Sequence, residues 1–328
     1  MNRRETLLAL MVLGTASVSG RSLAQQTGKI WRIGWLLPRS AAEGDADYFA
    51  AFPQGLRDLG YIEGKNLVIE RRFAEFKQER FPALAAELVQ LNVDVLVASG
   101  TQATAAAQKA TATIPIVMTN TTDPVASGFV KTLAHPGGNI TGRSTFTGDL
   151  RPKQLEFLLS VVPKARRVAA LFNPTMLNPK LLDSLQEAAK NAGVRIIPVE
   201  ARFKHEIDDA FASMAHQKVE AVVVVNDALF DGSPRQIADL AAKYHLPLIG
   251  SNRTYTEAGC LMNYGPNYAE NYRRSAYYVD RILKGTKPGD LPVEQPMVFE
   301  FLINQKTAKA LGIKIPKTTS LTATEVIE

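Results

Sequence analysis

A strand–helix–strand unit in residues 93–124 constrains the fold of this chain more than any other stretch. The apolar run VDVLVA leads into SGT, an alanine-rich helical segment follows, and a second apolar run, IPIVM, leads into TNTT. The apolar positions of each run are nearly continuous, which is typical of a parallel strand that is buried on both faces. The unit therefore predicts an open α/β sheet, and such sheets bind ligands beyond the carboxyl ends of their strands.

The same alternation of strand and helix extends over most of the chain and predicts parallel sheets with right-handed crossovers. Besides the unit above, apolar runs predict strands at 29–37, 67–73, 167–172, 194–199, 221–225, 246–249, 260–264 and 297–303. Helical spacing of apolar residues predicts helices at 48–59, 80–91, 154–162, 179–191, 206–216, 234–244, 267–283 and 307–311.

One stretch breaks this rhythm and divides the chain into two halves. LAHPGGNITGRSTFT, residues 133–147, is rich in glycine, proline and threonine, and we expect it to be the first crossing between two domains. The GGNITG within it matches a dinucleotide-binding fingerprint only superficially, because it neither follows a clean strand nor opens a helix. The second half repeats the architecture of the first.

We therefore expect an α/β protein of two similar doubly wound parallel-sheet lobes, joined by a three-segment hinge. The first lobe is predicted to hold residues 29–145 and about 262–297, and the second to hold 146–253 and about 303–328. The second crossing is expected to begin near Asn252 and Arg253.

The first residues have the pattern of a signal peptide, predicted at 1–24. Arg3 and Arg4 precede an apolar stretch from Leu7 to Val18, and small residues ending at Ala24 suit a signal peptidase. The apolar stretch is too short to span a bilayer stably. We expect a periplasmic mature protein, exported by the Sec or the Tat route.

Charge and cysteine content limit the class of protein further. The formal net charge of +6 falls to +4 when residues 1–24, with three arginines and one glutamate, are removed. This small, scattered excess does not predict a nucleic-acid partner. The only cysteine, Cys260, excludes an intramolecular disulfide and lies too far from the signal segment for a lipid anchor.

Three long segments resemble a known family. IPIVMTNTTDPVASGFVKTLAHPGGNITG, AGCLMNYGPNYAENYRRSAYYVDRILKGTKPGDLPVEQP and FEFLINQKTAKALGIKIP resemble TrpX-like substrate-binding proteins of ABC transporters, which have the type I periplasmic-binding fold. The resemblance covers nearly all of the mature chain. It implies a two-lobed receptor that captures a small solute and delivers it to an ABC permease in the inner membrane. Some members bind tryptophan or other aromatic amino acids.

This sequence departs from the family pattern at three places. Gln102 stands where many members have proline, Cys260 stands where glycine is usual, and the N-terminal cysteine of lipoprotein members is missing. Because Gln102 adjoins the expected solute site, the first departure bears on solute identity more than on fold.

Polar residues at the predicted strand ends are the candidate solute contacts. A helix start beside a strand end offers backbone N–H groups to an anion, with hydroxyls adding hydrogen bonds, although Thr101 also suits a simple N-cap. The ten candidates are Ser99, Gly100, Thr101, Asn120, Thr121, Thr122, Asn173, Asn226, Asp227 and Ser251. Asp227 is the preferred acceptor for an ammonium group, whereas Asp123 is better explained as a cap.

Three aromatic residues are candidates for stacking on an aromatic solute. These are Trp35, Tyr264 and Tyr268, although for Trp35, inside a strand, packing in the core is the favoured interpretation.

Catalytic functions lack sequence support. The four histidines have no metal-binding spacing, no nucleophile elbow or phosphate-binding loop occurs, and Cys260 beside an apolar strand suits a small buried residue. We expect no enzyme activity, metal or cofactor, and a monomer. A ligand-sensing module for a receptor kinase or chemoreceptor is the alternative function. The solute stays open between an amino acid, an aromatic acid and a dicarboxylate.

Overall fold

Two separate sheets form the framework of the computed structural model, which describes residues 29–41, 47–145, 150–175 and 182–328. The predicted signal peptide lies outside the described residues. All elements below belong to one unit, residues 31–328. The first sheet has the order β2-β1-β3-β4-β5, and all of its strand pairs are parallel. Its strands are β1 (Trp31–Leu37), β2 (Leu67–Phe73), β3 (Val95–Ser99), β4 (Ile116–Thr121) and β5 (Ile140–Ser144).

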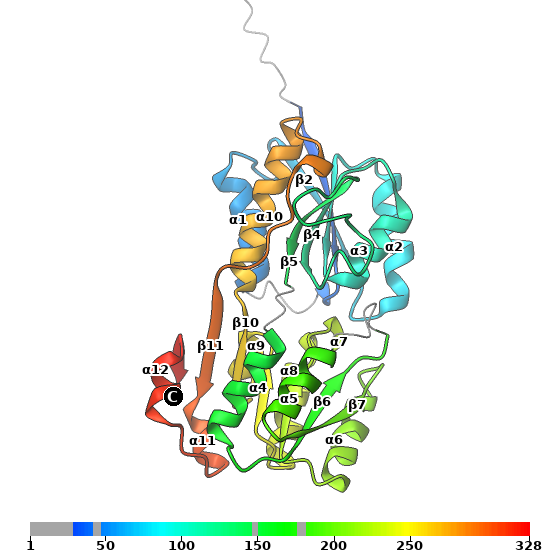
Figure 1. Cartoon of the computed structure of the whole chain (residues 1–328). Helices are drawn as coiled ribbons and strands as arrows, with labels where there is room; N and C mark the ends of the chain where they lie inside the picture. Colours follow the sequence, from blue (N-terminus) through cyan, green and yellow to red (C-terminus); the bar gives the residue numbers. More distant parts are fainter. Residues whose placement is uncertain (1–28, 42–46, 146–149, 176–181) are drawn as a thin grey trace, which may run out of the picture. The chain divides into compact units, whose positions relative to one another are not determined.

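Helices cover both faces of the first sheet, as its continuous apolar strands require. α2 (Phe81–Gln90) and α3 (Thr101–Ala110) pack on one face, and α1 (Asp47–Asp58) and α10 (Tyr268–Leu283) pack on the other (Figure 1). Alternate residues of β3 enter the two cores, because successive side chains of a strand point to opposite faces. We call this sheet with its four helices the first lobe.

The second sheet has the order β12-β11-β10-β9-β8-β6-β7 and is parallel except between β10 and β11. Its strands are β6 (Arg167–Phe172), β7 (Arg195–Glu200), β8 (Ala221–Val224), β9 (Leu248–Gly250), β10 (Met262–Pro266), β11 (Phe299–Asn304) and β12 (Glu325–Ile327). Its helices are α4 (Leu150–Val161), α5 (Asp183–Asn191), α6 (Glu206–His216), α7 (Ala228–Asp231), α8 (Pro234–Lys243), α9 (Arg253–Glu257), α11 (Gln305–Ala310) and α12 (Lys317–Thr322). Together these form the second lobe.

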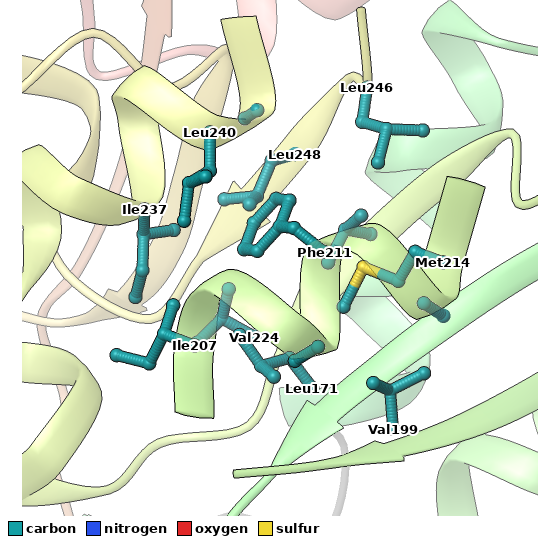
Figure 2. Packing of buried hydrophobic residues seen from close by; sticks show 14 of the residues in the cluster. Leu171, Val199, Ile207, Phe211, Met214, Val224, Ile237, Leu240, Leu246 and Leu248 are labelled. Carbon is teal, nitrogen blue, oxygen red and sulfur yellow. The ribbon is translucent and has the colours of Figure 1, made fainter. Parts of the chain in front are cut away.

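Apolar residues at helical spacing form part of the hydrophobic core of the second lobe. Figure 2 shows Phe211 and Met214 of α6 beside Ile237 and Leu240 of α8, over Val224 of the sheet, and all five side chains are buried. Full burial of a side chain of this size contributes about 1.5–3 kcal/mol. Because this packing is rigid, it holds the carboxyl ends of β6, β8 and β9 in fixed positions.

The prediction of two doubly wound α/β lobes is confirmed. One predicted strand belongs to the other lobe, however: β10, expected in the first lobe, pairs with β9 in the second sheet. The second crossing is not at Asn252 and Arg253, because Asn252 caps α9 inside the second lobe, accepting a hydrogen bond from Thr254 N. The chain instead crosses between β10 and α10.

The first predicted crossing also needs correction, because residues 140–144 form β5 rather than a linker. The GGNITG stretch thus ends in a strand. A Cβ at Gly142, whose φ is +128°, would lie 2.2 Å from Met118 O, so glycine here permits close pairing with β4 rather than phosphate binding. Pro53 lies inside α1, within the helix predicted at 48–59.

Three connections join the two sheets: one between β5 and α4, one between β10 and α10, and one between the 3₁₀ turn Pro288–Asp290 and β11. Before the third connection reaches β11, Glu294 N donates to Gly142 O and Ser144 N donates to Glu294 O, which fastens it along β5. Within the described parts of the chain, no helix has the length and apolar character needed to cross a bilayer.

Candidate functional site

The polar ends of β3 and β4 are held in place by helix α10. The hydroxyl of Tyr272 hydrogen-bonds to the side chains of both Ser99 and Asn120. Trp35 Nε1 donates to Ser99 Oγ at 3.0 Å, and Asn271 Nδ2 donates to Asn120 Oδ1 at 2.8 Å. Burial raises the pKa of Tyr272, so its hydroxyl stays neutral. These side chains therefore form a neutral, fixed surface.

Helix α3 begins at this surface and points its first backbone N–H groups beyond the strand ends. Gly100 precedes it with φ +92°, a conformation that side-chain-bearing residues rarely adopt, and a Cβ there would meet nothing within 4 Å. Thr101 Oγ1 accepts a hydrogen bond from Thr122 N at 3.0 Å and joins the two strand-end loops. The open space at Gly100 leaves room for an anion at the helix N-terminus.

Thr121, one of the predicted solute contacts, has a hydroxyl that is bonded within the first lobe. Its fully buried hydroxyl shares a hydrogen bond of 2.9 Å with Thr104 Oγ1, which in turn donates to Gly100 O at 2.8 Å. These two hydrogen bonds connect β4 to the start of α3 and stabilise it. Asp123, explained above as a cap, accepts from Ala126 N at 3.0 Å in a turn.

Asp227 is the centre of the polar strand ends in the second lobe. Its Oδ1 accepts hydrogen bonds from Leu229 N at 2.9 Å and from Asn173 Nδ2 at 3.0 Å. Its Oδ2 accepts from Gln102 Nε2 at 3.0 Å, a side chain of the first lobe. Burial raises the pKa of Asp227, and these hydrogen bonds oppose that rise. Asp227 is thus both the N-cap of α7 and a buried carboxylate next to the start of α3.

The other two candidates of the second lobe belong to the same cluster. Asn226 Nδ2 donates to the hydroxyl of Tyr268 and, at 3.4 Å, to Ser251 Oγ. The structure thus gathers Asn173, Asn226, Asp227 and Ser251 at one edge of the second sheet. The bond from Gln102 connects this edge to the Gly100–Thr101 turn.

A second acid in this cluster, the partly buried Asp231, was missed from the sequence. Asp231 Oδ1 accepts from Asn252 Nδ2 at 2.9 Å and from the Tyr255 hydroxyl at 3.0 Å, and Oδ2 accepts from the Tyr268 hydroxyl at 3.3 Å. Burial raises the pKa of Asp231 to about 7 against these hydrogen bonds, and the charge of Asp227 raises it further. The available signal was its spacing, four residues after Asp227 and one helical turn along α7.

Arg151 is the second residue that sequence analysis missed. It lies in the first turn of α4 with 6% of its surface exposed, and Nη1 donates to Gln154 Oε1 at 3.0 Å. Burial lowers the pKa of Arg151 to about 10, against the influence of Tyr268, Asp231 and Tyr255, so the guanidinium is charged at neutral pH. Helix α4 thus brings a positive charge to the edge that carries the two acids.

The aromatic candidates differ in their surroundings. Trp35 packs in the core of the first lobe, as favoured, and Tyr264 packs against Phe301 and the nearby Phe157 and Phe299. Tyr268 instead meets Tyr48 with ring centroids 5.7 Å apart. Tyr48 and Tyr268 line a cavity of about 470 Å³. Its other lining residues are Asn252, Arg253, Thr254, Glu257, Asn267, Ala269 and Glu300. Of the three candidates, Tyr268 alone adjoins both this cavity and the acid cluster.

The described residues contain no cluster of His, Cys, Asp and Glu side chains that could hold a metal ion. Cys260 is buried among the apolar side chains under α8, and burial raises the pKa of its thiol. A neutral thiol in an apolar core is a poor nucleophile. The site can therefore bind a polar molecule, but it presents no activated nucleophile.

Comparisons with known proteins relate nearly the whole chain to one class of protein. The family model described as ABC transporter substrate binding protein matches residues 43–327. A curated "Tyrosine-binding protein" of Clostridioides difficile (strain R20291) is 30% identical over 264 residues, which are 80% of this chain and 76% of the relative.

Two solved structures are similar over nearly the whole chain. An ABC domain from Streptococcus pneumonia in complex with L-Trp is 27% identical, with a TM-score of 0.84 over 90% of this chain and 99% of its own. A conserved domain protein from Vibrio cholerae O1 biovar El Tor is 28% identical, with a TM-score of 0.85 over 91% and 100%. Receptors of the type I periplasmic-binding class, at lower identity, share the fold alone.

Proposed function

Because the chain belongs to the ABC transporter substrate-binding protein family, we propose that it captures an amino acid for an ABC importer. The resemblance predicted from the sequence is thereby confirmed. Proteins of this family are substrate-binding components rather than enzymes, and they work extracytoplasmically with an ABC permease. The proposal concerns which solute this chain binds, and how.

The position of Asp227 is the observation that carries the proposal. A carboxylate that is nearly fully buried is costly unless its charge is used or paired. In the described residues its partners are a backbone N–H and two neutral amides, and no cation pairs with it. The ammonium group of an amino acid would supply the missing charge. An aromatic acid or a dicarboxylate would bring a second negative charge to the same place, so an amino acid fits better than either.

The start of α3 provides the place for the carboxylate of the solute. Gln102 joins Asp227 to the first turn of α3, so the two ends of an amino acid can lie against Asp227 and the backbone N–H groups after Gly100. Tyr48 and Tyr268 supply aromatic surface next to Asn226. The named tyrosine-binding relative and the structure with L-Trp support an aromatic amino acid.

A solute with contacts on both lobes would favour their closure. Ligand binding shifts an open–closed equilibrium only as far as the ligand binds the closed state better, and closure around a ligand is the motion of periplasmic binding proteins. The permease would then recognise the closed form. We place the mature protein in the periplasm, on the strength of the signal-peptide pattern of residues 1–24.

Thermal unfolding tests this proposal. The exported protein is purified through a denature–refold step that removes carried-over solute and is then screened with amino acids, aromatic acids, dicarboxylates and NAD. At 100 times its dissociation constant, a solute stabilises the folded state by about 2.7 kcal/mol. A saturable shift with one or more amino acids supports the proposal. A shift with a dicarboxylate or NAD alone contradicts it.

Neighbouring genes for a permease, rather than for a receptor kinase, would favour transport over sensing.

A further inference from the structure

Arg151 carries a buried charge for which the described residues provide no counter-ion. Its surface is 6% exposed, and in the described part of the chain its guanidinium makes one hydrogen bond, to the neutral Gln154. No ion pair joins it to a carboxylate there. Arg143, which is similarly buried, by contrast pairs with Glu294 at 2.6 Å. A buried cation without a partner destabilises the folded state, so its retention calls for an explanation.

The surroundings of Arg151 place its charge at the solute site. Gln154, one helical turn further along α4, donates to Gly250 O at 3.3 Å, at the end of β9, and to Tyr264 O at 2.8 Å in the neighbouring strand β10. Arg151 therefore lies near the end of β9, which Ser251 directly follows. The influence of Tyr268, Asp231 and Tyr255 on the pKa of Arg151 is consistent with this position.

Arg151 and Asp231 are close enough to interact electrostatically, yet they do not form an ion pair. Asp231 is engaged by Asn252, Tyr255 and Tyr268, which are neutral donors. A pair of opposite charges held apart in a buried site matches a molecule that carries both charges. A zwitterion can place its ammonium group against the acids and its carboxylate against the arginine.

We propose that Arg151 binds the carboxylate of the solute from the second lobe and thereby determines specificity for zwitterions. This inference rests on the proposed function, because it assumes an amino acid in the site. The carboxylate then has donors from both lobes, the backbone N–H groups of α3 and the guanidinium of Arg151. A planar guanidinium suits this task because it can give a carboxylate two parallel hydrogen bonds.

Comparing the binding of an amino acid with the binding of its amide distinguishes a carboxylate-binding role of Arg151 from a structural role. L-Tyrosine and L-tryptophan are each compared with L-tyrosinamide and L-tryptophanamide, which keep the ring and the ammonium group but lack the carboxylate. Dissociation constants are measured by calorimetry on refolded wild type, Arg151→Gln and Arg151→Lys. The matched control is Lys153→Gln, an exposed residue of the same helix that pairs with Glu156.

We expect Arg151→Gln to weaken binding of the amino acid by about 30-fold or more, because a hydrogen-bonded charge is lost. Binding of the amide is expected to change by less than about 3-fold, because the amide offers no charge for Arg151 to bind. Arg151→Lys recovers part of the affinity for the amino acid, and Lys153→Gln changes neither. The unfolding temperature of unliganded Arg151→Gln should not fall, because the substitution removes an uncompensated charge.

Equal losses for amino acid and amide, or a lower unfolding temperature of the unliganded variant, would assign Arg151 a structural role and overturn the inference. Unchanged binding of the amino acid by Arg151→Gln would overturn it as well, with the proposed function intact. If refolded wild type binds no amino acid, the proposed function itself fails, which is a separate outcome because it appears before any variant is measured.

Discussion

The two lobes end their strands in chemically different ways. In the first lobe, Ser99 and Asn120 are neutral and are held by Tyr272 and Asn271 of α10. One group of charges in this lobe is paired, since Glu294 bonds to Arg143 at 2.6 Å and to Arg274 at 2.7 Å. In the second lobe, Asp227, Asp231 and Arg151 also lie near the strand ends, and within the described residues their hydrogen-bond partners are neutral groups.

This difference indicates that the two lobes have different functions in binding. A surface whose polar groups already bond to each other provides shape and a helix N-terminus, at little cost in stability. A surface with unpaired buried charges costs stability, and binding sites commonly retain such groups because the ligand completes them. We infer that the second lobe selects the charges of the solute, while the first lobe positions it.

The largest expected effect is that of Asp227→Asn. Asparagine can still cap α7 and accept a hydrogen bond, so the fold should persist. The charge that receives the ammonium group is lost, and affinity for the amino acid should fall by about 100-fold or more, as for truncated buried charge pairs. Calorimetry on the refolded variant measures this, with Asp209→Asn on the exposed face of α6 as the control. Undiminished affinity would remove Asp227 from the site.

Gly100→Ala tests the contribution of the first lobe. A side chain at φ +92° strains the backbone and should destabilise the protein by about 1–2 kcal/mol. Gly60 is a matched control, because it has φ +91° and also lacks any neighbour within 4 Å of a Cβ. Both variants should unfold at similarly reduced denaturant concentrations, but only Gly100→Ala should weaken solute binding. Equal affinities in the two would show that the start of α3 does not contact the solute.

Tyr272→Phe should act on stability more than on binding. Loss of its hydroxyl leaves Ser99 and Asn120 without a shared partner in a buried place and should cost about 1–2 kcal/mol. Tyr61→Phe, which removes a hydrogen bond of 3.0 Å to Asp280 in the same lobe, serves for comparison. Denaturant unfolding should show similar losses in both. A loss of affinity in Tyr272→Phe as large as that in Asp227→Asn would contradict the supporting role of α10.

In the pH dependence of stability, the two lobes should differ in sign. Burial raises the pKa of Asp231 to about 7 in the folded state, above an unfolded value of about 3.9. Between about pH 4 and 7 the folded state therefore keeps a proton that the unfolded state has released, and stability falls as pH rises. Asp231→Asn should flatten this part of the unfolding profile.

Glu294 should have the opposite effect. Arg274 and Arg143 lower the pKa of Glu294, so its contribution to stability is present above the unfolded value of about 4.3 and is lost as the solution becomes more acidic. Glu294→Gln should alter the profile only on the acid side of about pH 4.5. Unfolding midpoints of wild type and both variants across pH check this pair of slopes. The assignment of the two slopes would be contradicted if Asp231→Asn changed the slope below about pH 4.5, or if Glu294→Gln changed the slope between about pH 4.5 and 7.

Much of the fold could be predicted from hydrophobic patterning, because strands buried on both faces produce unmistakable apolar runs. β5 was missed because its five residues, ITGRS, are mostly polar or small, and their burial depends on contacts with the distant Leu291 and Glu294. β10 was placed in the wrong lobe because a strand that precedes a crossing has no local sign of which sheet it joins. Strand order is set by tertiary pairing, which sequence periodicity does not record.

Only part of the candidate site could be predicted, because the sequence records local patterns but not tertiary packing. Residues that directly follow buried strands, such as Asn173 and Asp227, could be identified by position alone. Asp231 and Arg151 could not, because they reach the strand ends from helices, and only the packing of α4 and α7 brings them there. Tyr272 was missed as well, since a tyrosine on the apolar face of α10 shows no sign that its hydroxyl meets β3 and β4.

A crystal structure of the refolded protein with the amino acid that stabilises it most tests the central claim most directly. The account predicts a solute between the two sets of strand ends, with its ammonium group within hydrogen-bond distance of Asp227 or Asp231. Its carboxylate should contact the start of α3, Arg151 or both. An amino acid bound away from these strand ends, or bound there with its ammonium group facing neither acid, would contradict the account.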